Sequence, residues 1–137
     1  MGTKLGKRTT LKMARVTKAS TFSRILTDVE VAWLAGILDG EGNIRVDYPN
    51  PRYPDYAYPK VIVVNTCLPL LERIKEITGV GQIKSRSWKA KDHHKDSWHW
   101  VVGGHAAISV LNQILELLIA KQDHALAALS TSIDSER

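Results

Sequence analysis

The sequence predicts an α+β fold in which a four-stranded antiparallel sheet has helices packed on one of its faces. Helical and strand patterns follow one another in the order αββαββα, so that an αββ unit occurs twice in tandem. The strands within each unit are joined by turn-forming residues, which favours hairpins and therefore antiparallel pairing. With 137 residues, 44% of them hydrophobic, the chain has the size and apolar content of one domain.

The first helix is expected over about residues 28–40. Thr27 can cap it, and Glu30, three residues later, can reach back to complete a capping box. The apolar residues of this helix occupy more than one stripe, so both of its faces favour burial. One face can pack on the domain's own core, whereas the other needs a second partner.

A hairpin is expected after the first helix. Residues 43–48 alternate between polar and apolar side chains with period two, as in a half-buried strand. A loop rich in Pro and Tyr then leads to a second strand over residues 60–66, which contains the β-branched run at residues 61–64.

The same pattern recurs in the second half of the chain. The spacing of apolar residues predicts a helix over residues 68–78, and two strands follow over about residues 82–88 and 97–102. The next helix is expected over about residues 105–120, and a further helical segment begins around Gln122.

The sheet face away from the helices is predicted to be polar and partly basic. Strand alternation places these side chains on it: Asn43, Arg45, Asp47, Lys84, Arg86 and His99. Two strands can enter a DNA major groove, where arginine pairs with guanine and Asn or Gln with adenine. Each of these residues, taken singly, is equally well explained as an ordinary solvated strand residue.

The charge balance favours polyanionic partners, because nineteen Lys and Arg residues against fourteen Asp and Glu residues give a formal charge of +5. Seven of the basic residues lie in the first 24 positions, where no acidic residue occurs. Residues 1–26 are therefore interpreted as a flexible basic arm, and residues 27–137 as a single domain. A solvated tail, a nucleic-acid-binding arm and an organellar transit peptide all stay open for residues 1–26.

Cys67 is the one cysteine of the sequence, so neither a disulfide framework nor a thiolate zinc site is expected. It lies in an apolar run and is expected to be buried. No apolar stretch is long enough to cross a membrane, and the sequence has no recognisable signal peptide. The expected location is intracellular: cytoplasmic in a prokaryote, and organellar or nuclear in a eukaryote.

Residues 93–100 contain three histidines and an aspartate. A zinc site is disfavoured there, because His93 and His94 are adjacent in a predicted turn and no cysteine is near. A hairpin tip that contacts DNA phosphates is favoured instead, with positive charge supplied by Lys89, Lys91 and Lys95.

Residues 34–42, with the sequence LAGILDGEG, resemble the nine-residue motif of the LAGLIDADG homing endonucleases and are identical to it at five positions. The αββαββα order is similar to the core of that family, and the resemblance covers about residues 27–129. It includes the glycine turn at residues 77–81 and the segment 117–122, which looks like the family's segment with a basic residue. The resemblance implies a site-specific endonuclease that cleaves double-stranded DNA by metal-dependent phosphodiester hydrolysis.

The resemblance also implies a homodimer, because two motif helices pack together in this family and the chain has one copy of the motif. Such a dimer would bind a long, pseudo-palindromic DNA site. A glycine inside a helix costs roughly 1 kcal/mol relative to alanine, and close helix packing would offset that cost. Asp39 is expected to have a structural role at the helix end. The residues implied at the interface are Leu34, Ala35, Gly36, Asp39 and Gly40.

The same resemblance makes Glu41 the essential metal ligand, together with the Gly40 carbonyl and the scissile phosphates. Mg²⁺ is the implied ion because it prefers oxygen ligands; Mn²⁺ is expected to substitute, and Ca²⁺ to support binding without cleavage. Lys121 would stabilise developing negative charge and Asn65 would position solvent, with Gln122 as a weaker candidate. The alternative for Lys121 is that it only separates two helices.

Other functions stay open. An RNA maturase that helps its intron fold would use the basic surface and would not need Glu41. A DNA-binding regulator without nuclease activity would keep the fold, although Glu41 argues against it. A protein–protein interaction module is disfavoured by the carboxylates beside the glycines.

Overall fold

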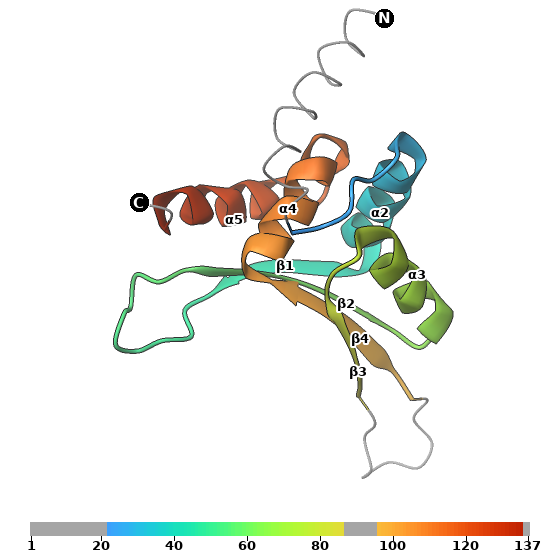
Figure 1. Cartoon of the computed structure of the whole chain (residues 1–137), viewed down its shortest axis with the longest axis horizontal. Coiled ribbons are helices and arrows are strands. Elements are labelled where there is room, and N and C mark those ends of the chain that lie inside the picture. The colour runs from blue at the N-terminus through green and yellow to red at the C-terminus, as the bar shows by residue number, and fades with distance from the viewer. Residues whose placement is uncertain (1–21, 87–95, 136–137) are drawn as a thin grey trace, which may run out of the picture.

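Four strands form a single antiparallel sheet in the computed structural model, which describes residues 22–86 and 96–135 (Figure 1). The helices lie together on one side of the sheet, and no described element covers its opposite face (Figure 1). The predicted α+β class and the αββαββα order are confirmed, and the further helical segment follows them. The elements are α2 (Asp28–Glu41), β1 (Gly42–Asp47), β2 (Tyr58–Asn65), α3 (Leu68–Thr78), β3 (Gln82–Ser85), β4 (Trp98–Gly103), α4 (Gly104–Ile114), the 3-10 turn η1 (Leu115–Leu117) and α5 (Gln122–Ser135).

The strand order across the sheet is β1-β2-β4-β3, so that β2 and β4 are the two central strands. Each predicted hairpin is present, and the two hairpins join through antiparallel pairing of β2 with β4. β3 ends at Ser85, although Arg86 still donates its backbone N–H to the Ser97 carbonyl at 2.7 Å. The end of the predicted third strand, at residues 87–88, lies outside the described residues.

The hydrophobic core lies between one sheet face and the inner faces of the helices. Val61, Val63 and Trp100 point into it and are fully buried, at alternate positions of β2 and on β4. The Trp100 indole donates from Nε1 to the Val80 carbonyl at 3.0 Å, so its polar atom is satisfied within the core. None of the described helices is long and apolar enough to span a membrane.

α2 begins with the predicted capping box. Thr27 Oγ1 accepts a hydrogen bond from the Glu30 backbone N–H at 3.2 Å, and Glu30 Oε1 accepts one from the Thr27 N–H at 2.9 Å. The bond from the Thr27 backbone is the main reason why the pKa of Glu30 lies below its ordinary value. The box fixes the start of the helix whose other end bears Glu41.

The helix predicted over residues 105–120 is wrong in its extent, because α4 stops at Ile114. A 3-10 turn and a non-helical segment separate it from α5. The reason is tertiary: the backbone N–H groups of Ile119 and Lys121 donate to the Asp39 carboxylate instead of to carbonyls of their own helix. An acceptor from α2 therefore holds residues 119–121 outside a helix that the local sequence pattern would continue.

Residues before the predicted boundary at residue 27 pack against the helices. Leu26 is 2% exposed, and its backbone N–H donates to Gln113 Oε1 on α4 at 2.8 Å. Gln113 Nε2 in turn donates to the Arg24 carbonyl at 3.0 Å. Residues 22–26 thus belong to the domain, while residues 1–21 of the predicted basic arm lie outside the described residues.

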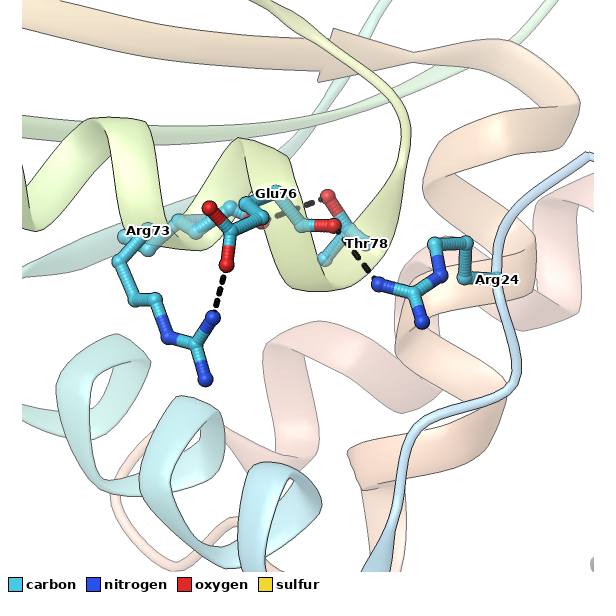
Figure 2. A network of polar contacts seen from close by, with 5 residues as sticks. Arg24, Arg73, Glu76 and Thr78 are labelled. Atoms are coloured by element: carbon cyan, nitrogen blue, oxygen red, sulfur yellow. Dashed lines mark hydrogen bonds and ion pairs between the residues drawn. The ribbon is translucent and has the colours of Figure 1, made fainter.

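Arg24 connects the segment of residues 22–26 to the end of α3 by hydrogen bonds (Figure 2). Its backbone N–H donates to the Thr78 carbonyl at 2.8 Å, and its Nη1 donates to the Glu76 carbonyl at 3.0 Å. Arg73 forms an ion pair with the Glu76 carboxylate. Gly79 ends α3 with a φ of 71°, and a Cβ there would lie 2.8 Å from Arg24 Cγ. The chain therefore enters the domain between α3 and α4.

Candidate functional site

The end of α2 is joined to β1 without a loop, and this junction fixes the position of Glu41. Glu41 is the last residue of α2, and Gly42 is the first residue of β1. Gly42 donates its backbone N–H to the Leu38 carbonyl, and a Cβ at residue 42 would lie 2.8 Å from the Leu38 Cα. Glycine allows this close approach of two backbones, so the last glycine of the motif is what lets the helix end present Glu41.

Asn65 restrains the Glu41 side chain, which is exposed to solvent. Asn65 lies at the end of β2 and donates from Nδ2 to Glu41 Oε2 at 2.6 Å. Its Oδ1 accepts from the Cys67 backbone N–H at 2.8 Å, which fixes the orientation of the amide. The structure therefore brings together Glu41 and Asn65, which the sequence had placed in one site.

Cys67 is exposed, so the expectation that it is buried is wrong. It occupies the N-cap position of α3. At that position the chain leaves β2 and the core, so an apolar neighbourhood in the sequence does not become burial in the fold.

Lys121 and Asp39 make reciprocal contacts at the end of α2. Lys121 Nζ donates to the Leu38 and Asp39 carbonyls, both at 2.9 Å. These carbonyls belong to the last turn of α2, where a positive charge is favourable. The Leu38 carbonyl accepts the Gly42 N–H as well. Asp39 makes the helix-end contacts that its expected structural role requires. Gln122 donates instead to the Leu115 carbonyl at 3.1 Å, away from Glu41.

Oxygen donors suited to a divalent ion are present at the end of α2, although few come from one chain. The exposed Glu41 offers a carboxylate, and the Gly40 carbonyl precedes it in the backbone. Across residues 22–86 and 96–135, no group of three or more His, Cys, Asp or Glu side chains could hold a metal ion. This donor set fits an ion that takes further ligands from phosphates and from water, as Mg²⁺ commonly does.

The outer face of α2 is exposed and lacks side chains at two positions. A Cβ at Gly36 or Gly40 would meet nothing within 4 Å among the described residues. Two large apolar side chains accompany these glycines, with Val29 78% exposed and Trp33 37% exposed. We refer to Val29, Trp33, Gly36 and Gly40 as the outer face of α2.

Three of the residues expected at a dimer interface are engaged within the chain itself. Leu34 and Ala35 are 0% and 1% exposed, because they occupy the stripe of α2 that faces the core. Asp39 is half-buried and accepts the backbone N–H groups of the segment before α5. Leu34, Ala35 and Asp39 are therefore not free for a contact with another chain, whereas the outer face of α2 is exposed.

The open face of the sheet carries an ion network on β1 and β2. Arg45 Nε lies 3.0 Å from Asp47 Oδ1, and Lys60 Nζ lies 3.4 Å from Asp47 Oδ2. Lys60 is opposite Arg45 in the sheet register. The sequence prediction for this face included Arg45 and Asp47 but not Lys60. Side chains alternate between the two faces of a strand, so Lys60 lies on the same face as residue 62, and this alternation could have identified it.

His99 joins Lys84 and Arg86 on the other half of the open face, as predicted. Lys84 is directly opposite His99 in the register, and Arg86 is two residues further along. The pKa of His99 lies below its ordinary value, chiefly because burial disfavours the charged imidazole, with added repulsion from Arg86 and Lys84. Its Nδ1 is buried and has no hydrogen-bond partner among the described residues. The imidazole therefore offers an unused polar atom.

The centre of the open face is apolar, which the prediction of a polar face missed. Ile62, Val64 and Val101 lie there on the two central strands and are half-buried. The expected DNA contacts of Lys89, Lys91 and Lys95, and the pair His93 and His94, lie outside the described residues.

No protein-family model matches the chain, and no curated protein sequence matches it. Solved structures do match. The homing endonuclease I-CvuI, in complex with its target in the presence of calcium, is 22% identical with a TM-score of 0.61, over 74% of this chain and 64% of that chain. The archaeal intron-encoded homing endonuclease I-Vdi141I, complexed with DNA, is 21% identical with a TM-score of 0.63, over 80% of this chain and 70% of that chain.

A third similar structure is the group I intron-encoded homing endonuclease I-CeuI, complexed with DNA. It is 14% identical with a TM-score of 0.61, over 81% of this chain and 57% of that chain. The chain thus spans less than two thirds of the length of the I-CvuI and I-CeuI chains that it matches. At these identities the similarity establishes the fold.

Proposed function

We propose that this chain, whose fold is that of the LAGLIDADG homing endonucleases, is a site-specific endonuclease acting on double-stranded DNA. The observation on which the proposal mainly rests is the exposed Glu41 carboxylate at the end of α2, restrained by Asn65 at 2.6 Å. A carboxylate in this position suits a metal ligand better than a direct contact with DNA, because it repels the phosphates. The open sheet face supplies the cations that attract a DNA backbone, among them Arg45, Lys60 and Lys84.

Glu41 and the Gly40 carbonyl would hold a divalent ion, with further ligands from a second chain and from the DNA phosphates. Mg²⁺ suits these oxygen donors, Mn²⁺ would substitute for it, and Ca²⁺ would support binding without cleavage. The ion would supply a water of lowered pKa and would neutralise charge on the scissile phosphate.

The residues around Glu41 position it. Asn65 holds one oxygen of the carboxylate, and Gly42 lets β1 start directly behind it. Lys121 binds the carbonyls of Leu38 and Asp39 and so fixes the last turn of α2. A direct contact of Lys121 with a scissile phosphate would require Nζ to leave these carbonyls, so its first role is to orient the helix end.

The functional unit would be a homodimer in which the outer faces of two α2 helices meet. Val29 and Trp33 supply apolar surface for this contact, and the absence of side chains at Gly36 and Gly40 lets two backbones approach closely. A two-fold axis would then bring together one Glu41 from each chain. Each chain would bind one half of a long, pseudo-palindromic site. An intracellular location goes with this function.

The test is cleavage of a randomised duplex DNA library by the purified chain with Mg²⁺, in parallel with Glu41→Gln and with Ca²⁺ in place of Mg²⁺. Glu41→Gln keeps the size of the side chain and an acceptor for Asn65 but removes the charge. We expect cuts at one pseudo-palindromic sequence, lost in Glu41→Gln while binding is retained. Glu72→Gln, at an exposed position of α3, is the matched control and should cut like the unmodified chain.

Two outcomes would contradict the proposal. Sequence-selective binding without cuts under Mg²⁺ or Mn²⁺ would identify a DNA-binding regulator. Binding of structured intron RNA with no binding of duplex DNA would identify a maturase.

A further inference from the structure

Three apolar side chains occupy the centre of the sheet face that the helices leave open. Ile62, Val64 and Val101 are half-buried, and they alternate with the buried core residues Val63 and Val102 along the same strands. They lie outside the hydrophobic core. We refer to Ile62, Val64 and Val101 as the open-face apolar patch.

The sheet register places part of this patch in a continuous row across all four strands. Asn43 on β1 is opposite Ile62 on β2, Ile62 is opposite Val101 on β4, and Val101 is opposite Gln82 on β3. Asn43 and Gln82 are both exposed. The row therefore presents an amide, two adjacent apolar side chains and a second amide to the open side.

These groups match one kind of base pair. In the major groove, thymine presents a methyl group that makes apolar contacts, and adenine presents the N6 and N7 atoms that Asn or Gln can bind through two hydrogen bonds. An A·T pair offers both features on one edge. β-branched residues are frequent in strands in any case, but that preference does not account for amides at both ends of the same row.

The position of the row in the sheet suits entry into the groove. A major groove is about 12 Å wide and admits two strands, and neighbouring strands are about 4.8 Å apart. β2 and β4, which bear Ile62 and Val101, are the central pair. Two strands about 4.8 Å apart would leave room on either side within a groove about 12 Å wide, so the amide side chains of Asn43 and Gln82 could reach base edges from β1 and β3. Lys84 and Arg86 lie to one side and Arg45 and Lys60 to the other, so positive charge for the phosphates flanks the apolar patch.

The neighbouring residues are less suited to reading guanine. The Asp47 carboxylate binds both Arg45 and Lys60, at 3.0 and 3.4 Å, and these are the cations nearest to Asn43 and Ile62. Arginine or lysine bound to guanine is the commonest specific contact in the major groove. Here the two cations share an acid, which leaves the apolar patch and the amides as the groups that face the bases.

We propose that the row formed by Asn43, Ile62, Val101 and Gln82 selects A·T base pairs, with Ile62 and Val101 contacting thymine methyl groups and the two amides contacting adenine. This inference rests on the proposed binding of duplex DNA and adds the base pairs that each half-site must contain. Val64 extends the apolar surface toward the end of β2 that bears Asn65.

The experiment begins with the duplex sequence selected by the unmodified chain in Ca²⁺. Each thymine in a half-site is replaced singly by uracil, which removes only the methyl group, and the dissociation constant is measured by fluorescence anisotropy. At the contacted thymines we expect binding to weaken about fourfold, the equivalent of one buried methyl group.

The same uracil series is then measured with Ile62→Thr and with Val101→Thr, which keep β-branching and a strand-forming residue. In each variant, replacing the thymine that the altered side chain contacts by uracil should weaken binding by less than about twofold. The reason is that the thymine methyl group stabilises the complex only through its contact with that side chain. Lys84→Ala is the control and should weaken binding equally for thymine and uracil. Unchanged thermal unfolding confirms that the variants fold.

The outcomes separate the two proposals. If the chain binds no duplex DNA, the proposed binding itself fails, and this inference fails with it; binding of duplex DNA without selection of a sequence overturns the base readout alone. If a sequence is selected but uracil at every position binds like thymine, only the readout by methyl groups is overturned. It is also overturned if the uracil effects persist unchanged in both Ile62→Thr and Val101→Thr, because the methyl groups would then be read elsewhere.

Discussion

Asp39, near the end of α2, binds the backbone that leads into α5, and Lys121, just before α5, binds the backbone at the end of α2. The Asp39 carboxylate accepts the backbone N–H of Lys121 at 3.1 Å and that of Ile119 at 2.9 Å, while Lys121 Nζ donates to the carbonyls of Leu38 and Asp39. These backbone groups lie where helices end or begin, and apart from the Leu38 carbonyl, which also accepts the Gly42 N–H, they lack partners within a helix. One pair of residues thus fixes α5 against the helix that bears Glu41.

Replacing Asp39 should therefore destabilise the whole domain. Asp39→Asn removes the charge that two backbone N–H groups bind, and we expect the free energy of unfolding to fall by about 1–3 kcal/mol. Lys121→Met should also lower it, and the double variant should lose less than the sum because the two residues stabilise one junction. Urea unfolding measures all three variants.

Asp55→Asn is the control for Asp39→Asn, because Asp55 lies exposed in the loop between β1 and β2. Its effect should stay within about 0.5 kcal/mol. A loss in Asp39→Asn no larger than in this control would mean that the junction contributes nothing to stability.

The sequence predicted those elements whose limits are set by neighbouring residues. α3 has the predicted bounds, Leu68–Thr78, because Pro69 suits its first turn and Gly79 ends it in the left-handed region. α4 was predicted too long because residues 119 and 121, which the prediction placed in or next to it, donate to the Asp39 carboxylate, about eighty positions earlier in the chain. A periodic pattern contains no information about such an acceptor.

The site was predictable where the motif itself contains it. Glu41 followed from the resemblance of residues 34–42, and Asn65 from the alignment of β2 with the same family. The sequence did not predict that Arg45 and Lys60 lie opposite each other on neighbouring strands. Their positions depend on the strand register across a long loop, which the sequence leaves undetermined. Register is also what creates the row from Asn43 to Gln82.

Asn65 should matter for cleavage more than for DNA binding. Asn65→Ala removes the donor that holds Glu41 Oε2, and loss of such an orienting contact typically lowers metal affinity or activity by about 10- to 100-fold. Cleavage rate as a function of Mg²⁺ concentration, together with binding in Ca²⁺, separates the two effects.

Asn65→Asp tests the same contact in a different way. Aspartate still accepts from the Cys67 backbone N–H but places a second carboxylate against Glu41, so it should lose at least as much cleavage as alanine. Full activity in both variants would show that Glu41 needs no restraint from β2.

His99 should make stability depend on pH. Burial, Arg86 and Lys84 hold its pKa below the ordinary value of 6.5, while Val64 on the adjacent strand adds no charge. Between that lowered pKa and 6.5, the unfolded chain binds a proton that the folded chain does not. The free energy of unfolding should therefore decrease as the pH falls through this interval.

His99→Gln should remove this part of the pH dependence. Urea unfolding of both proteins at several pH values on either side of 6.5 is the measurement. The same slope in the variant and in the unmodified chain would assign the pH dependence to other groups.

Gly36→Ala should stabilise the single chain and weaken the proposed dimer. Alanine is favoured over glycine by roughly 1 kcal/mol within a helix, and a Cβ at residue 36 would meet nothing within 4 Å among the described residues. In a dimer formed through the outer faces of α2, the same methyl group would enter the closest contact between the two helices. The effects on folding and on association should therefore have opposite signs.

Urea unfolding at low protein concentration measures the first effect, and sedimentation equilibrium measures the second. Ala127→Gly, at an exposed position of α5, is the mirrored control: it should lower stability by roughly 1 kcal/mol and leave association unchanged. If Gly36→Ala stabilises the chain and associates as strongly as before, the two chains do not meet at Gly36. The dimer contact would then have to use a different surface, and the position of Glu41 near a two-fold axis would lose its support.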